Sequence, residues 1–121
     1  MTRLTMRFDL RVAPFAKTTF ARQHRALPEM ADWADRVGVD EIILSEHHGD
    51  PAGFSSAPFT LAAAILARTE APAVQVSAAL VPLHDPVRLA EQLATLDCLA
   101  PGRLSVVCGA GYRSVEFEMA G

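Results

Sequence analysis

The sequence predicts an α/β fold in which parallel strands alternate with helices. Short apolar runs recur along the 121 residues, and each is followed by a segment with helical spacing, in the order β-α-β-α-β-α-β. Each strand and helix together have the length of one crossover unit, so consecutive strands are expected to run parallel. A content of 50% hydrophobic and 21% charged residues fits a globular domain. Two architectures fit: an open doubly wound sheet, or half of an eight-stranded barrel, which typically needs about 250 residues.

The first unit consists of a strand, a long loop and a helix. Leu4 to Val12 is rich in strand-forming residues, and the segment APFAKTTFARQ after it is long enough to carry function. Gly38 then ends a helix whose apolar residues share one face, namely Leu27, Met30, Ala31, Ala34 and Val37. Because proline is tolerated in the first turn of a helix, Pro28 places the helix start near Arg25 or Ala26.

Two further strands and a helix follow. Ile42 to Leu44 is a continuous apolar run, which is typical of a strand covered on both faces in a parallel sheet. Phe59 to Arg68 is rich in alanine and predicts a helix, with Pro58 in its first turn and serines just before it. Val74 to Val81 predicts the third strand.

The third helix has the clearest signals in the chain. Asp85 suits the N-cap, Pro86 suits the first helical position, and one apolar face is formed by Leu89, Leu93 and Leu96. We therefore interpret His84 and Asp85 as helix-start residues and not as catalysts. After the stop signal PGR, Leu104 to Cys108 predicts the fourth strand, GAGY a turn, and RSVEFEMAG the start of another helix.

The composition excludes some classes of partner. A formal net charge of -3 with scattered basic residues gives no reason to expect a nucleic acid or an anionic membrane. No stretch approaches the roughly 20 apolar residues of a membrane span, and no signal peptide is recognisable, so a cytoplasmic protein with small-molecule partners is expected. Cys98 and Cys108 form no C-x-x-C motif, and we expect both to be small buried apolar residues.

The trio Glu46, His47 and His48 directly follows the second strand, at the sheet edge where parallel strands gather functional side chains. Successive side chains of an extended segment point to opposite sides, so only one histidine can face a site there, and the pair is a poor chelate. No metal site is therefore expected. An imidazole here can hydrogen-bond a bound heterocycle or transfer a proton near neutral pH. The alternative is that the trio only caps a loop and satisfies backbone groups.

Small residues follow the third and fourth strands. Gly109 and Gly111 resemble phosphate-binding glycines, but the third glycine is replaced by Ser114 and no room remains for the usual acidic residue about 20 positions later. The two glycines either let a flat ligand approach the backbone or make a tight turn. The small side chains at 77–79 likewise either clear space beside a planar ring or fill a crowded barrel interior.

Several segments, in one order, resemble the N-terminal half of luciferase-like flavin-dependent monooxygenases. These are FDLRV, GVDEIILSEHHG, SAPFTLAAAILART, PLHDPVRLAEQLATLDCLAPGRL and GAGYRSVEFEMAG, which together cover nearly the whole chain. The resemblance implies a TIM-type (β/α)8 barrel, of which this chain holds four parallel strands, three helices and the start of a fourth. It also implies a small organic substrate, oxygen, and reduced FMN as cofactor, with a deazaflavin coenzyme as the alternative.

The resemblance assigns roles to residues. His47 matches the family's catalytic histidine beside the flavin, with Glu46 and His48 as supporting cofactor-binding residues. A non-prolyl cis peptide bond is expected under the flavin ring, and the nearest positions are Ser77, Ala78 and Ala79. The further cofactor-binding positions that the resemblance implies are Gly109, Gly111 and Tyr112.

The family continues through four more strands, so we expect residues 1–121 to be a truncated luciferase-like monooxygenase domain, from β1 to β4 of the barrel, and its activity as a fragment is an open question. The alternative is a catalytically inactive half-barrel that forms a homo-oligomer or pairs with a complementary subunit. A flavin reductase is a further candidate partner. A third interpretation is a flavodoxin-like binding domain of complete size.

Overall fold

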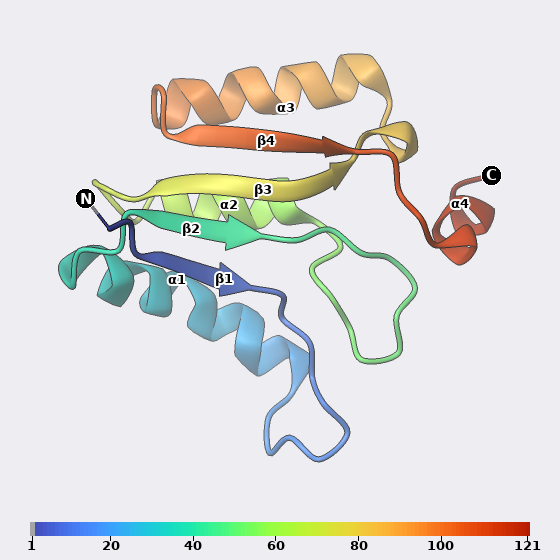
Figure 1. Ribbon diagram of the computed structural model, residues 1–121, viewed down its shortest axis with the longest axis horizontal. Coiled ribbons are helices and arrows are strands. Elements are labelled where there is room, and N and C mark those ends of the chain that lie inside the picture. Colours follow the sequence, from blue (N-terminus) through green and yellow to red (C-terminus); the bar gives the residue numbers. More distant parts are fainter. Residues whose placement is uncertain (1) are drawn as a thin grey trace.

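The computed structural model describes residues 2–121, which form a sheet of four parallel strands. The strands β1 (Thr5–Phe8), β2 (Glu41–Leu44), β3 (Ala73–Leu80) and β4 (Leu104–Gly109) lie side by side in sequence order (Figure 1). The helices are α1 (Phe20–Arg36), α2 (Pro58–Leu66), α3 (Pro86–Leu99) and α4 (Ser114–Ala120), and a 3-10 turn, η1 (Val81–Leu83), follows β3. The predicted alternation is confirmed, because each neighbouring pair of strands is parallel.

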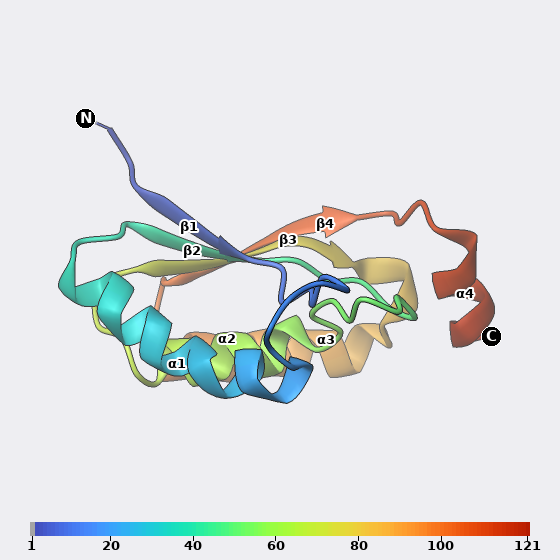
Figure 2. The ribbon, with the colours of Figure 1, turned by 90° about the horizontal axis from the view of Figure 1, so that it is seen from below.

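Helices α1, α2 and α3 all cover the same face of the sheet (Figure 2). Beneath them, Ile42 and Leu44 of β2 and Val74 and Val76 of β3 are fully buried in the hydrophobic core. A doubly wound sheet has helices on both faces and a reversal in its strand order. The one-sided helices and the sequential order exclude that alternative, together with the flavodoxin-like interpretation, and match one part of a barrel wall.

The opposite face of the sheet carries the side chains that alternate with those of the core. Arg7, Ile43, Gln75 and Ser105 are register partners across the four strands. Gln75 Nε2 donates a hydrogen bond to Ser105 Oγ at 3.3 Å. In a closed barrel this face would line the interior. Among the described residues, β1 and β4 each have a strand neighbour on one side only.

The start predicted for α1, near Arg25 or Ala26, is wrong. The helix begins at Phe20, because the hydroxyl of Thr19 accepts a hydrogen bond from Arg22 N at 3.2 Å and caps it. Pro28 lies inside the helix, where it removes one backbone donor. The buried face of α1, formed by Leu27, Ala31 and Ala34, outweighs that local loss.

The first strand is shorter than predicted. It ends at Phe8 and not at Val12, because Leu10 has a left-handed backbone with φ of 59°. The side chain of Asp9 supports this bend by accepting a hydrogen bond from Arg11 N at 3.1 Å. The residues that follow therefore form a loop at the carboxyl end of the sheet.

The expectation of buried cysteines is also wrong, since Cys98 and Cys108 are both exposed. Cys98 lies two positions after Leu96, which turns it away from the buried face of α3. Cys108 lies on the edge strand β4, beside an irregularity in its pairing with β3.

The remaining predicted elements are confirmed within one or two residues. Asp85 is the N-cap of α3, and its side chain accepts from Arg88 N at 2.9 Å. Pro58 begins α2, although Ala57, and not a serine, holds the cap position. Over residues 2–121, no helix has both the length and the apolar character needed to cross a bilayer.

Candidate functional site

The candidate site lies where the carboxyl ends of the strands meet, at the right of Figure 1. The loops after β1 and β2 and the short helix α4 gather at this end of the sheet (Figures 1 and 2). The trio Glu46–His48 leaves β2 here, two residues beyond Leu44. Parallel α/β folds place their ligands at this edge of the sheet.

A cavity of about 310 Å³ at this edge brings most of the predicted site residues together. Its lining includes Glu46, His47, Ser77, Ala78, Gly109, Gly111 and Tyr112, all of which the sequence singled out, and also Arg7, Ser45, Leu80 and Ala110. Two predicted residues lie elsewhere: Ala79 is fully buried in the core, and His48 lines a neighbouring cavity.

The floor of the cavity is made by small residues of β3 and β4. The peptide bond between Ser77 and Ala78 is cis, in the segment where the resemblance implied such a bond. A Cβ atom on Gly109 would lie 2.8 Å from the Cβ of Ala78, so only glycine lets the two strands approach here. Small residues of both strands therefore line the cavity here, with Arg7 and Tyr112 also among the lining residues.

The cavity also holds a polar atom with no partner. Ser45 is 2% exposed, and its Oγ is buried without a hydrogen-bond partner among the described residues. Buried hydroxyls are normally hydrogen-bonded. A lining of small residues, an imidazole and an exposed tyrosine fit a planar heterocycle that carries hydrogen-bonding atoms at its edge, as a flavin does.

His47 is held from several sides. Its backbone N–H donates to Ser55 O at 3.0 Å. Its ring meets the ring of Phe54 edge-on at a centroid distance of 4.7 Å, and that of Tyr112 at 6.1 Å. Its Nδ1 lies 3.1 Å from Glu116 Oε1. The side chain stays 20% exposed, so the ring is positioned without being sealed from the cavity.

His48 lies on the other side of the chain, as the strand alternation predicted. Its Nε2 lies 3.0 Å from Glu46 Oε1, and His84 Nε2 lies 2.8 Å from the same oxygen. The second carboxylate oxygen of Glu46 accepts from Leu80 N at 2.7 Å. Glu46 is 2% exposed. The interpretation of His84 as only a helix-start residue therefore missed its place in this cluster.

Glu116 is the site residue that sequence reasoning missed entirely. It comes from α4 and is 1% exposed, and its Oε1 accepts a hydrogen bond from His48 N at 3.0 Å and lies 3.1 Å from His47 Nδ1. Burial raises the pKa of Glu116, but these hydrogen bonds and the positive charges of His47 and Arg113 outweigh it, so its pKa lies below 4.5. In the sequence, Glu116 stands between Val115 and Phe117 with no motif to mark it.

A second cavity, of about 270 Å³, adjoins the first and is lined by Glu46, His48, His84 and Glu116, among others. Glu46 lines both cavities. Within residues 2–121, no three His, Cys, Asp or Glu side chains are arranged to hold a metal ion.

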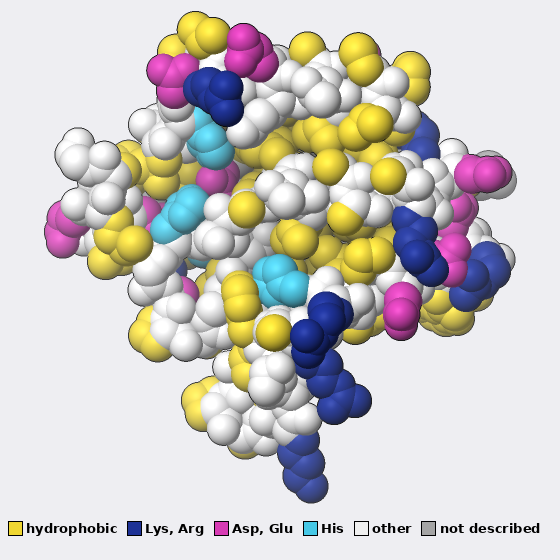
Figure 3. Space-filling model, turned by 180° about the vertical axis from the view of Figure 1, so that it is seen from behind, with side chains coloured by type: hydrophobic (Ala, Val, Ile, Leu, Met, Phe, Trp, Pro, Cys, Tyr) yellow, Lys and Arg dark blue, Asp and Glu magenta, His cyan; other side chains and the backbone are white. Residues whose placement is uncertain are grey.

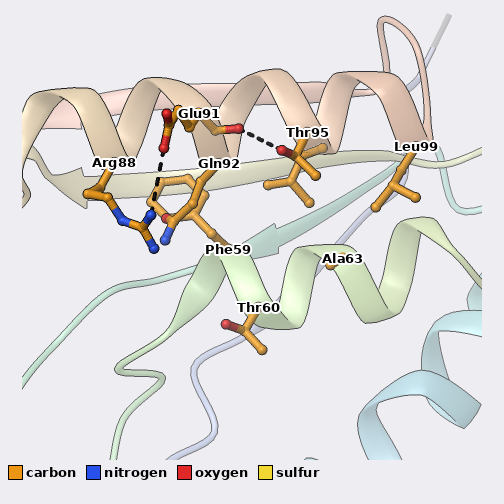
Figure 4. Close-up of a pocket in the computed structure, with 9 residues that line it drawn as sticks. Phe59, Thr60, Ala63, Arg88, Glu91, Gln92, Thr95 and Leu99 are labelled. Atoms are coloured by element: carbon orange, nitrogen blue, oxygen red, sulfur yellow. Dashed lines mark hydrogen bonds and ion pairs between the residues drawn. The ribbon is translucent and has the colours of Figure 1, made fainter.

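A further cavity, of about 330 Å³, lies between α2 and α3 on the outer helical face. Figure 3 shows hydrophobic side chains gathered between these helices, and Figure 4 shows Phe59, Ala63 and Leu99 in the groove with an ion pair between Arg88 and Glu91 at 3.7 Å. This groove lies away from the strand ends and has no histidine in its lining. The candidate site is therefore the histidine-bearing cavity at the strand ends.

Comparison with known proteins identifies the family of this chain. Residues 7–121 match the family model of luciferase-like monooxygenases. The chain is 32% identical over 93 residues to 4-hydroxyprotoasukamycin monooxygenase of Streptomyces nodosus subsp. asukaensis, and the match covers 77% of this chain and 25% of that protein.

Solved structures give the same fold. The oxygenating constituent of 3,6-diketocamphane monooxygenase from Pseudomonas putida, in complex with FMN, matches 100% of this chain and 33% of its own, with a TM-score of 0.87 and 24% identity. An F420-dependent secondary alcohol dehydrogenase in complex with an F420-acetone adduct matches 98% of this chain and 38% of its own, with a TM-score of 0.69 and 22% identity. The chain thus spans between 25% and 38% of the length of these proteins, and it belongs to the luciferase-like monooxygenase family.

Proposed function

We propose that this chain carries the flavin-binding half of a luciferase-like monooxygenase that oxidises a small organic substrate with oxygen. The observation that carries the proposal is the cavity at the strand ends, whose lining includes His47, the small residues Ser77 and Ala78, and Gly109. The cofactor is reduced FMN, with a deazaflavin coenzyme as the alternative. A flavin reductase would supply the reduced flavin.

The chemistry divides between cofactor and protein. A bound reduced flavin supplies the electrons for oxidation, and the protein supplies binding, orientation and the exclusion of water. Ser77, Ala78 and Gly109 are the small residues against which a ring would lie at the strand ends. His47 is the catalytic acid–base group, because an imidazole can hold or release a proton near neutral pH. His48 and Glu46, which contact each other beside it, are supporting residues.

Ligand binding by the purified chain tests this proposal. We expect saturable binding when FMN or reduced FMN is titrated into the chain under anaerobic conditions, followed by flavin fluorescence and absorbance. A deazaflavin titration run alongside identifies the preferred cofactor. Failure of all three to saturate would contradict flavin binding by this chain, although its family membership would stand.

Two exposed aromatic residues form a matched pair of variants for this titration. Tyr112 is 82% exposed and lines the cavity, whereas Phe15 is 89% exposed in the loop before α1 and lines none of the cavities described above. Tyr112→Ala should weaken flavin binding about three- to tenfold, as loss of an aromatic contact does. Phe15→Ala should leave the Kd unchanged, and equal effects of the two variants would argue against binding in this cavity.

A second candidate function is favoured by the uncovered sheet face. Among residues 2–121, β1 and β4 have unpaired edges, and Val107 on the open face is 44% exposed. Unpaired edges and open apolar surface promote association. According to this second hypothesis, the chain is a catalytically inactive half-barrel that self-associates as a homo-oligomer or pairs with a complementary subunit. Light scattering that gives the mass of a monomer at high concentration would contradict the self-association.

A further inference from the structure

The three histidines of the site meet carboxylates through different ring nitrogens. His47 faces Glu116 Oε1 with Nδ1, at 3.1 Å. His48 and His84 both face Glu46 Oε1 with Nε2, at 3.0 and 2.8 Å. An ionised carboxylate only accepts hydrogen bonds, so the nitrogen that faces it must carry the proton. The adjacent residues His47 and His48 are thus set to hold opposite tautomers.

Glu116 is well suited to enforce the tautomer of His47. Its Oε1 also accepts from His48 N–H at 3.0 Å, and a backbone N–H can only donate, so this oxygen is an acceptor whatever the state of His47. The side chain is 0% exposed, so water does not compete for it. The lowered pKa of Glu116 keeps it ionised at neutral pH.

Helix α4 packs against the loop after β2 (residues 45–57, the histidine loop), and these contacts hold Glu116 in place. Arg113 Nη2 lies 3.2 Å from Asp50 Oδ2, and Arg113 Nη1 lies 3.8 Å from Glu116 Oε1. Gly49, with φ of 64°, leaves room for Met119, whose sulfur would lie 2.5 Å from a Cβ at that position. The carboxylate is therefore fixed relative to His47 before any ligand binds.

We propose that Glu116 is a positioning residue that keeps the proton of neutral His47 on Nδ1 and leaves Nε2 as the acceptor on the cavity side. Glu116 lines the neighbouring cavity and not the cavity of His47, so Nδ1 points away from the proposed ligand. Among the described residues, Nε2 of His47 has no hydrogen-bond partner. The ring can then accept a proton from a bound molecule through Nε2, with its positive charge stabilised by Glu116. The catalytic meaning of this role rests on the proposed function.

The tautomers can be read directly in the free chain. Long-range nitrogen–proton correlation spectra of the 15N-labelled protein, recorded at about pH 8.5 where an ordinary imidazole is neutral, distinguish the two ring nitrogens. We expect Nδ1 to carry the proton in His47, and Nε2 to carry it in His48 and His84. A His47 ring protonated mainly on Nε2 would overturn the proposal, and no variant is needed to reach that result.

Variants separate positioning from general support of the fold. Glu116→Leu removes the acceptor and should shift the tautomer ratio of His47 toward Nε2–H by about tenfold or more, as expected for loss of a charge-assisted hydrogen bond. Glu116→Gln keeps an acceptor oxygen and should retain most of the Nδ1–H form. Glu118 lies on the same helix and is exposed, so Glu118→Leu is the matched control and should change nothing. A folded Glu116→Leu chain with the tautomer ratio of the wild type would also refute the role.

Failure of this inference is distinguishable from failure of the proposed function. A chain that shows the expected tautomers but binds no flavin would retain the positioning role of Glu116 and lose the proposed function. A chain that binds flavin with His47 protonated on Nε2 would retain the proposed function and lose the positioning role.

Discussion

Replacing Glu46 by leucine should destabilise the fold by about 2–4 kcal/mol. Both Glu46 and Leu80 are buried, at 2% and 5% exposure, and Leu80 N donates to Glu46 Oε2 at 2.7 Å. Leucine leaves that backbone N–H without an acceptor, which costs about 1–3 kcal/mol. The side chains of His48 and His84 are 27% and 22% exposed, so they can turn to water, and each adds about 0.5 kcal/mol.

Glutamine at position 46 provides the conservative comparison. Its amide oxygen can accept from Leu80 N–H, while its amide nitrogen can donate to the two histidines after they change tautomer. We therefore expect Glu46→Gln to cost about 1 kcal/mol or less. Glu118→Leu, at an exposed position of α4, should stay within about 0.5 kcal/mol of the wild type.

Urea unfolding at pH 7, followed by far-UV circular dichroism, measures these differences as changes in the free energy of unfolding. The predicted order of stability is wild type and Glu118→Leu first, Glu46→Gln next and Glu46→Leu last. If Glu46→Leu unfolds at the same urea concentration as Glu118→Leu, the carboxylate does not hold the strand ends together, and the reasoning is wrong.

Three other predictions concern the scaffold and pH. Asp85→Ala removes the acceptor for Arg88 N and should cost about 1 kcal/mol in urea unfolding, whereas Asp85→Asn should recover most of it. Leu27→Ala, at a fully buried position of α1, should cost about 2–5 kcal/mol by the same assay. A smaller loss would show that the core around position 27 rearranges to fill the space left by the leucine side chain. The lowered pKa of Glu116 stabilises the fold at pH values above 4.5, and this stabilisation is lost as the pH falls through the lower pKa of the folded state. Urea midpoints measured between about pH 6 and pH 3 should therefore fall less steeply in Glu116→Gln than in the wild type, and parallel curves would contradict this.

Local sequence signals were sufficient for most of the fold. Asp85 and Pro86 located α3 to the residue, and the apolar run of β2 identified a strand of a parallel sheet. The errors arose where a distant contact decided the outcome. Pro28 favoured a late start for α1, but the cap at Thr19 and the buried face of the helix outweighed it.

The sequence predicted the parts of the site that depend on local strand geometry, but not the contacts between residues far apart in the chain. Alternation along the chain correctly separated His47 from His48, because that depends only on extended backbone. Glu116 lies 69 residues from His47, and nothing near it in the sequence indicates that α4 folds back onto the histidine loop. The contact of His84 was missed for the same reason, since its partner Glu46 is 38 residues away in the sequence.

Each residue of the trio has a separate role, because His47 contacts Glu116 while His48 contacts Glu46. Glu46 uses both oxygens on three donors, Leu80 N–H, His48 and His84, so little of it is left for a ligand although it lines the cavity. Its main effect is to fix the end of β3 and the start of α3 relative to β2. His47 is then the histidine of the trio that lines the cavity, and the carboxylate that it contacts, Glu116, comes from α4. Substitutions at Glu46 should therefore act mainly on stability, and substitutions at Glu116 mainly on the protonation state that His47 presents to a ligand.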